Sequence, residues 1–161
     1  MSGFFLGRIP SGGGLWRSTC LALFVLLGAC ESAFGPNGTN ELEAARARWS
    51  AAAVSDYSFS LRRSCFCPPE SIGPVLITVS NGQVVARTLI EAGIAVSDQE
   101  RWPAMEGVFD YAERALREAD EATVEFHPQW GYPTQITVDW IRQAVDDEES
   151  LTVLSFEPAS P

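Results

Sequence analysis

The sequence contains no lysine, and its 11 basic residues face 21 acidic residues, which gives a formal net charge of -10. A protein that neutralises nucleic-acid phosphates needs a basic face, so this balance argues against nucleic acid as a partner. The same sign of charge argues against electrostatic docking to anionic lipid. The 161 residues are nevertheless 46% hydrophobic and 20% charged, which is typical of one globular domain rather than a disordered chain.

The common catalytic signatures are also missing. The sequence has no G-x-S-x-G elbow, no P-loop and no dinucleotide fingerprint. It contains one histidine, His127, on which any base-assisted nucleophilic mechanism would have to depend. Asp139 with Glu125 is the one carboxylate pair that we consider, and nothing specific supports it. We therefore expect a protein that is not an enzyme and that carries no cofactor.

No apolar run is long enough to span a membrane as a helix. The longest such run near the N-terminus, residues 21–27, would extend about 10 Å as a helix, against roughly 30 Å of hydrocarbon. Arg8 and Arg17 precede it without any acidic residue, as in a signal peptide. The run ends in Gly28-Ala29-Cys30, and small residues directly before a cysteine resemble the lipobox of bacterial lipoproteins.

This resemblance implies that residues 1–29 are a lipoprotein signal peptide and that Cys30 is diacylated and becomes the mature N-terminus. The alternatives are an ordinary signal peptide with a chance cysteine, or a buried cysteine in a short helix. Two acyl chains hold a protein firmly to a bilayer. Residues 30–39, which contain Gly, Pro and Asn, are predicted to be a flexible tether. We expect localisation in the bacterial cell envelope, lipid-anchored on the extracytoplasmic side, with the membrane and an envelope protein as candidate partners.

Two helices are predicted in a single domain over residues 40–157, which leaves 158–161 as a tail. Asn40 and Glu43 form a capping-box pattern, which predicts a helix over residues 41–54. Its apolar stripe consists of Leu42, Ala45, Trp49 and Ala52, while Arg46 and Arg48 face outward. A second helix is predicted after a cap within residues 97–100, with Pro103 in its first turn. Its apolar residues follow helical spacing: Met105, Val108, Phe109, Ala112, Leu116 and Ala119.

Six strands complete the predicted domain. Tyr57, Phe59 and Leu61 alternate with polar residues in a half-buried strand that starts at Asp56 and runs into Cys65. Asn81-Gly82 between two apolar runs is a strong hairpin signal, because a type I′ turn requires positive φ twice. The other strands are predicted at residues 75–80, 83–90, 123–127, 135–140 and 151–156. The order indicates an α+β fold: an antiparallel sheet with two helices on one face, and a helix–three-strand plan that is a candidate duplication. The other face of the sheet is left to solvent or a partner.

Several short motifs together resemble one protein family. They are Tyr57-x-Phe59, Cys65-Phe66-Cys67, Asn81-Gly82, Gly131-Tyr132-Pro133-Thr134 and the following Asp139. Over roughly residues 42–156 the chain resembles bacterial lipoproteins that are catalogued as domain of unknown function 6174. The resemblance implies an exported domain without an assigned activity.

Cys65 and Cys67 form a disulfide candidate. With Cys30 lipidated, they are the remaining cysteines of the mature chain, in a compartment where free thiols seldom persist. Residues two apart in a flat strand have Cα atoms about 6.6 Å apart, which is near the upper limit for a bridge. A disulfide therefore requires a bend there, which Pro68-Pro69 can help to supply. A redox role, a metal role and free thiols remain open alternatives.

The sequence offers two candidate metal sites. Cys65 and Cys67 with His127 would offer two thiolates and an imidazole, a set suited to Zn or Cu(I), although no second histidine is available to complete it. The acidic run at residues 146–149 could bind Ca²⁺ weakly. It lacks the alternating spacing and central glycine of an EF-hand loop, so a solvated acidic loop is the preferred interpretation.

The turn with Trp130, Tyr132 and Pro133 is the binding candidate, and together with the Cys65–Cys67 bend it forms the binding surface predicted here. The competing interpretation is that the tyrosine closes over the core. The sequence thus predicts a lipid-anchored extracytoplasmic protein of unknown function that acts as a non-catalytic binding or interaction domain. The alternative is a thiol-redox or soft-metal-binding envelope protein that uses Cys65, Cys67 and His127. A structural envelope spacer is the third class.

Overall fold

The computed structural model describes residues 36–159. The predicted signal peptide, Cys30 and the first part of the tether lie outside these residues. In chain order the elements are α1 (Pro36–Ala52), β1 (Tyr57–Ser64), the short 3₁₀ helix η1 (Pro69–Ser71), β2 (Val75–Ser80), β3 (Gln83–Leu89), β4 (Ile94–Ala95), α2 (Met105–Glu118), β5 (Glu121–Phe126), β6 (Pro133–Asp139) and β7 (Glu148–Pro158).

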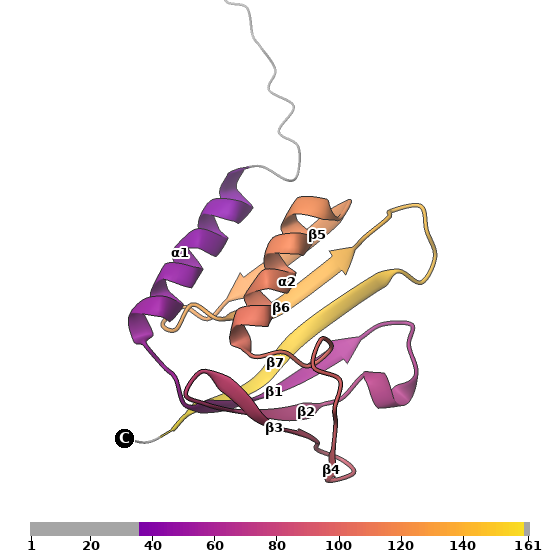
Figure 1. The fold of residues 1–161 in the computed structure, drawn as a ribbon. Helices are drawn as coiled ribbons and strands as arrows, with labels where there is room; N and C mark the ends of the chain where they lie inside the picture. The colour runs from indigo at the N-terminus through magenta and orange to yellow at the C-terminus, as the bar shows by residue number, and fades with distance from the viewer. Residues whose placement is uncertain (1–35, 160–161) are drawn as a thin grey trace, which may run out of the picture. The chain divides into compact units, whose positions relative to one another are not determined.

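The described strands form one antiparallel sheet in the order β4-β3-β2-β1-β7-β6-β5. β1 and β7, which are far apart in the sequence, pair at its centre. Both helices cover the same face of the sheet (Figure 1). The predicted α+β class, with two helices on one face of an antiparallel sheet, is therefore confirmed. The first helix is followed by four strands rather than three, because β4 has only two residues and is too short to show a sequence period.

The core lies between the helices and the covered face of the sheet. Leu42, Ala45 and Trp49 of α1 are buried, as the predicted stripe requires. On α2 the buried side chains are Met105, Val108, Phe109, Ala112 and Ala115. Tyr57, Phe59 and Leu61 meet them from β1, so the predicted alternation is also confirmed. Trp49 lies at the centre of this core and packs against the rings of Tyr57, Phe109, Tyr132 and Phe156.

The predicted start of each helix is wrong. α1 begins at Pro36 instead of following Asn40, so part of the expected tether is helical. Proline is favoured in a first helical turn, and Gly38 lies against Leu116 of α2, a contact that the sequence does not show. α2 begins at Met105 rather than near residue 100. Trp102, directly before Pro103, is fully buried. The ring of a proline disfavours helical backbone at the residue that precedes it, so the helix does not start before Pro103.

The β2–β3 hairpin follows its sequence signal. Asn81 and Gly82 have φ values of 51° and 73°, so both turn residues are left-handed as a type I′ turn requires. Asp56 fixes this turn from the neighbouring loop, since its Oδ1 accepts hydrogen bonds from Ser80 Oγ at 2.8 Å and from the Asn81 backbone N–H at 3.2 Å. Hydrogen bonds from Ser55, Ser80 and Asn81 hold the pKa of Asp56 below its usual value.

β7 is longer than predicted and extends from Glu148 to Pro158. Two of the four residues of the predicted acidic loop, Glu148 and Glu149, therefore belong to the strand. The strand also includes Pro158, which was predicted to be the first residue of the tail. β1 ends at Ser64 opposite Ser150 of β7, and β6 ends at Asp139 opposite Glu148. The Cys65–Cys67 segment and the loop of residues 140–147 therefore leave the same end of the sheet. We call this end the cysteine end.

Candidate functional site

The cysteine pair follows β1 directly. The Cα atoms of Cys65 and Cys67 are 5.3 Å apart, closer than in a flat strand and within the usual range for a disulfide. The bend that a bridge requires is thus present after Ser64. Both cysteines are partly buried, whereas Phe66 between them is 81% exposed.

A carboxylate with three side-chain donors lies beside the cysteine pair. Glu149 of β7 accepts hydrogen bonds from Arg63 Nη2 at 2.7 Å, from Tyr111 Oη at 2.5 Å and from Trp140 Nε1 at 3.0 Å. Burial by itself would raise the pKa of Glu149, but the hydrogen bonds from Tyr111, Arg63 and Trp140 outweigh it and hold the pKa below the ordinary value. The network joins β1, α2, the β6–β7 loop and β7 at one point.

Arg114 completes this arrangement from the next turn of α2. Its guanidinium lies 5.4 Å from the ring centroid of Tyr111 and 5.3 Å from that of Trp140. The two rings meet edge to face at 6.1 Å. Among the described side chains, which do not include that of Glu70, no carboxylate lies at ion-pair distance from this guanidinium. Arg114 is therefore held by aromatic faces while its hydrogen-bond donors stay available.

These groups line a surface pocket of about 450 Å³ at the cysteine end. Its wall contains three arginines (Arg63, Arg101, Arg114), three acidic residues (Asp98, Glu100, Glu149), Tyr111 and both cysteines. Arg101 pairs with Asp98 at 3.2 Å, as Arg63 pairs with Glu149. The formal charges of the lining balance in a chain that is strongly acidic as a whole. We call this pocket the arginine pocket.

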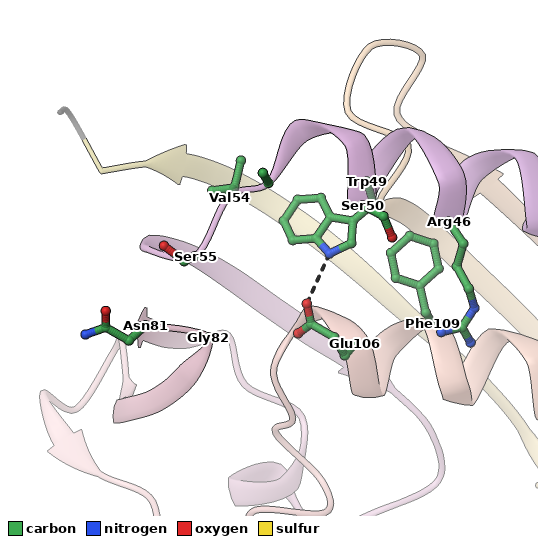
Figure 2. Close-up of a pocket in the computed structure, with 10 residues that line it drawn as sticks. Arg46, Trp49, Ser50, Val54, Ser55, Asn81, Gly82, Glu106 and Phe109 are labelled. Atoms are coloured by element: carbon green, nitrogen blue, oxygen red, sulfur yellow. Dashed lines mark hydrogen bonds between the residues drawn. The ribbon is translucent and has the colours of Figure 1, made fainter.

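A second pocket of about 400 Å³ lies between the end of α1, the β2–β3 turn and the start of α2 (Figure 2). In it Glu106 accepts hydrogen bonds from Trp49 Nε1 at 3.1 Å and from Tyr57 Oη at 3.3 Å. Arg46 lies over the ring of Phe109 and pairs with Asp110 at 3.0 Å. These polar groups bind α1 to α2, which makes this pocket a weaker candidate.

The predicted binding turn is a packing element. Tyr132 is 7% exposed and Pro133 is fully buried. Gly131 has φ 81°, and a Cβ there would lie 2.2 Å from the carbonyl oxygen of Ala45 in α1, so the turn lies tightly against the helix. Trp130 is half-buried against Phe156. The turn also follows β5 at the end opposite the cysteine pair, so the predicted joint surface with Cys65 and Cys67 does not form.

His127 belongs to that same opposite end. Its Nδ1 accepts hydrogen bonds from the backbone N–H groups of Gln129 and Trp130, and its ring stacks on Tyr132 at 4.9 Å. The histidine therefore does not join Cys65 and Cys67 in a metal site. Among the side chains that the structure describes, which leave out Glu70, no cluster of three or more His, Cys, Asp or Glu is placed to hold a metal ion.

The remaining acidic candidates are separated or already bonded. Asp139 pairs with Glu121 across the β5–β6 ladder, whereas Glu125 pairs with Gln135, so Asp139 and Glu125 do not face each other. Asp147 Oδ2 accepts the Ile141 backbone N–H at 2.7 Å and closes the β6–β7 loop. Burial, with the nearby charges of Asp147 and Glu148, raises the pKa of Asp139.

Sequence reasoning missed the Glu149 network and Arg114. One signal was present: Arg63 continues the inward alternation of Tyr57, Phe59 and Leu61, and an arginine at an inward strand position requires a partner. Nothing local in the sequence identifies Glu149 as that partner, because the two residues are 86 positions apart.

Comparisons with known proteins place the chain in a family without assigning an activity. No helix among the described residues is both long and apolar enough to cross a membrane. Neither the search of curated proteins nor that of solved structures gives a match. The family of unknown function DUF6174 matches residues 41–158, which include most of α1, the whole of α2 and every strand of the described sheet. The chain therefore belongs to this family of unknown function, DUF6174.

Proposed function

We propose that this protein is a lipid-anchored extracytoplasmic domain that binds a small ligand in the arginine pocket. The observation that supports binding most directly is Arg114, whose guanidinium is oriented by Tyr111 and Trp140 and has no carboxylate partner among the described residues. A planar guanidinium fixed by aromatic faces recognises carboxylate or phosphate groups well.

The anchor rests on the sequence alone. Arg8, Arg17, the short apolar run and Gly28-Ala29-Cys30 together resemble a lipoprotein signal peptide. An extracytoplasmic compartment also supports a disulfide between Cys65 and Cys67, since their spacing already fits one. Such a disulfide would hold the bend that forms one wall of the arginine pocket.

The ligand class follows from the charges in the pocket. Glu149 is engaged by three donors and Asp98 by Arg101, which leaves Arg114 as the unpaired cation and Glu100 as an acidic group in the lining. A small molecule with a carboxylate or phosphate group fits Arg114. Because the lining as a whole is neutral, a ligand that also carries a positive group, such as an amino acid, is favoured over a multiply charged anion.

The anchor is tested by intact mass of the full chain purified from membranes of an expressing bacterium. Acylation and cleavage before Cys30 predict a mature protein heavier than the bare 30–161 chain by its acyl groups. The Cys30→Ala variant should lose this modification. A wild-type protein that retains its initiating methionine and carries no lipid contradicts the anchor.

Binding is tested by NMR titration of the indole N–H of Trp140, which donates to Glu149 at the pocket. Acetate, inorganic phosphate and glycine serve as probes. Saturable shifts at Trp140 with at least one probe, lost in Arg114→Ala and kept in Arg117→Ala, support the proposal. Arg117 is the matched control because it lies on the same helix, is exposed and pairs with Glu113. Shifts that never saturate, or that survive Arg114→Ala, contradict it.

A second candidate function is thiol–disulfide exchange, because both cysteines line the same pocket as Arg114, a cation without a described carboxylate partner that would favour a thiolate. A thiolate of a reduced partner dithiol would attack one sulfur, break the S–S bond and form a mixed disulfide. The partner's second thiol would then displace the bound cysteine. Two electrons thus pass to Cys65 and Cys67, which take up two protons, and the partner becomes a disulfide.

The exchange is tested by equilibrating the protein in buffers with a series of ratios of reduced to oxidised glutathione. Free thiols are then alkylated, and intact mass counts them. A pair that interconverts between thiol and disulfide over the glutathione range supports it. A pair that stays oxidised in every buffer leaves the cysteines with a structural role and contradicts exchange.

A further inference from the structure

The two most exposed large apolar side chains of the described residues lie at the cysteine end. Val145 is 83% exposed and Phe66 is 81% exposed, the two highest values among the exposed large apolar residues of the described chain. Ile141, at 58%, lies on the same loop as Val145. Phe66 and this loop follow strand ends that the β-sheet register places together. We call Phe66, Ile141 and Val145 the apolar tip.

The chain enters the domain at this same end. Gly38, in the first turns of α1, lies against Leu116 near the end of α2. α2 leads within a few residues into Glu121 of β5, which pairs with Asp139 at the end of β6. The start of α1, the end of α2 and the β6–β7 loop therefore share one end of the domain (Figure 1).

The length of the connecting chain limits how far this end can lie from an anchor at Cys30. Residues 31–35 separate the proposed acylated Cys30 from Pro36 of α1, and these six Cα–Cα steps extend at most about 20 Å. α1 itself, with 17 residues, is about 25 Å long. An anchor at Cys30 would therefore reach the start of α1 more easily than its far end, which favours the cysteine end over the end with the β2–β3 turn as the side that faces the bilayer.

The charges around the apolar tip indicate the kind of lipid. Asp146, Asp147 and Glu148 follow Val145 directly, so attraction to anionic headgroups does not support this contact. Apolar side chains that project from two neighbouring loops fit the interfacial region of a zwitterionic bilayer instead.

We propose that the apolar tip inserts into the zwitterionic surface of the membrane that holds the acylated Cys30, and so orients the domain with its cysteine end toward the lipid. This inference rests on the proposed lipid anchor. It adds a second, protein-mediated membrane contact to the acyl chains.

The experiment compares Val145→Cys with the matched control Val85→Cys, which replaces an exposed valine of β3 away from the cysteine end. Val85 is 63% exposed. Both are made in the full chain with Cys20, Cys65 and Cys67 changed to serine and with Cys30 acylated or, in the control, replaced by alanine, so that the new thiol alone takes an environment-sensitive fluorophore. The acylated protein is reconstituted into vesicles of phosphatidylcholine and phosphatidylethanolamine.

A blue shift in vesicles and quenching by brominated lipid at position 145, but not at 85, is the expected result. Equal solvent exposure at both positions, or protection at 145 that persists in the lipid-free Cys30→Ala protein, overturns the inference. Vesicle flotation separates the two proposals. A chain that floats with an exposed position 145 keeps its anchor and lacks the tip contact, whereas a chain that neither floats nor carries acyl groups lacks the anchor.

Discussion

Arg63 of β1 donates to Glu149 of β7 at 2.7 Å, and this ion pair joins two strands whose pairing forms the centre of the sheet. The side chains of both residues are largely buried, at 15% and 18% exposure. Tyr111 and Trp140 use the other oxygen of the same carboxylate, so the pair is fully satisfied rather than an isolated buried charge. This one contact fixes the wall of the arginine pocket and the position of the cysteine bend.

Glu149→Gln should lower the free energy of unfolding at neutral pH by about 2 kcal/mol, because charge-assisted hydrogen bonds to Glu149 are weakened. The folded-state pKa of Glu149 is lowered, so its stabilisation is complete above the unfolded value near 4.5 and is lost as pH falls through the folded value. Urea unfolding should therefore show the two proteins converging below about pH 4.5. Glu148→Gln, at the exposed neighbouring position, should change little; an equal effect there would refute the assignment.

Gly131→Ala should destabilise the domain by about 3 kcal/mol. The new Cβ would meet the carbonyl oxygen of Ala45 at 2.2 Å, and φ is 81°. Gly82→Ala is the matched control, because Gly82 has a similar φ of 73° with open space around it. That variant should lose only about 1 kcal/mol. Thermal unfolding of both variants measures the difference, and equal losses would show that the turn does not lie tightly against α1.

Cys65→Ser should cost about 1.5 kcal/mol, since a bridge that closes so short a loop removes little entropy from the unfolded chain. The domain should remain folded, because its core does not depend on the bend. Circular dichroism and urea unfolding of the wild type, with and without a reductant, provide the comparison. The wild type under reducing conditions should match the variant; if reductant has no effect on the wild type, the cysteines are not bridged.

Trp49→Phe should cost about 2 kcal/mol, because it removes both ring volume at the centre of the core and the hydrogen bond to Glu106. In a Glu106→Ala background the same substitution should cost less, since that hydrogen bond is already absent. A double-mutant cycle by urea unfolding measures the coupling. Strictly additive effects would mean that the Trp49–Glu106 contact in Figure 2 contributes no stability.

Local patterns were sufficient where neighbouring residues decide the structure. The alternation of Tyr57, Phe59 and Leu61 predicted the strand β1, and Asn81-Gly82 predicted the separate β2–β3 hairpin, because side-chain period and turn backbone depend on a few adjacent residues. The predictions of the two helix starts were wrong, because tertiary contacts decide where these helices begin. Gly38 packs against Leu116, and Trp102 is drawn into the core.

The sequence by itself determined the α+β class, most of its strands, membership of its family and the expectation of an anchor at Cys30. Only the tertiary structure decided that the Trp130–Pro133 turn packs under α1, that His127 lies away from the cysteines, and that Arg63, Tyr111, Arg114 and Glu149 meet in one pocket. The reason is that burial and pairing across a sheet depend on strand order and register. The pairing of β1 with β7 links residues that are 86 (Ser64 and Ser150) to 101 (Tyr57 and Pro158) positions apart, which no local period encodes.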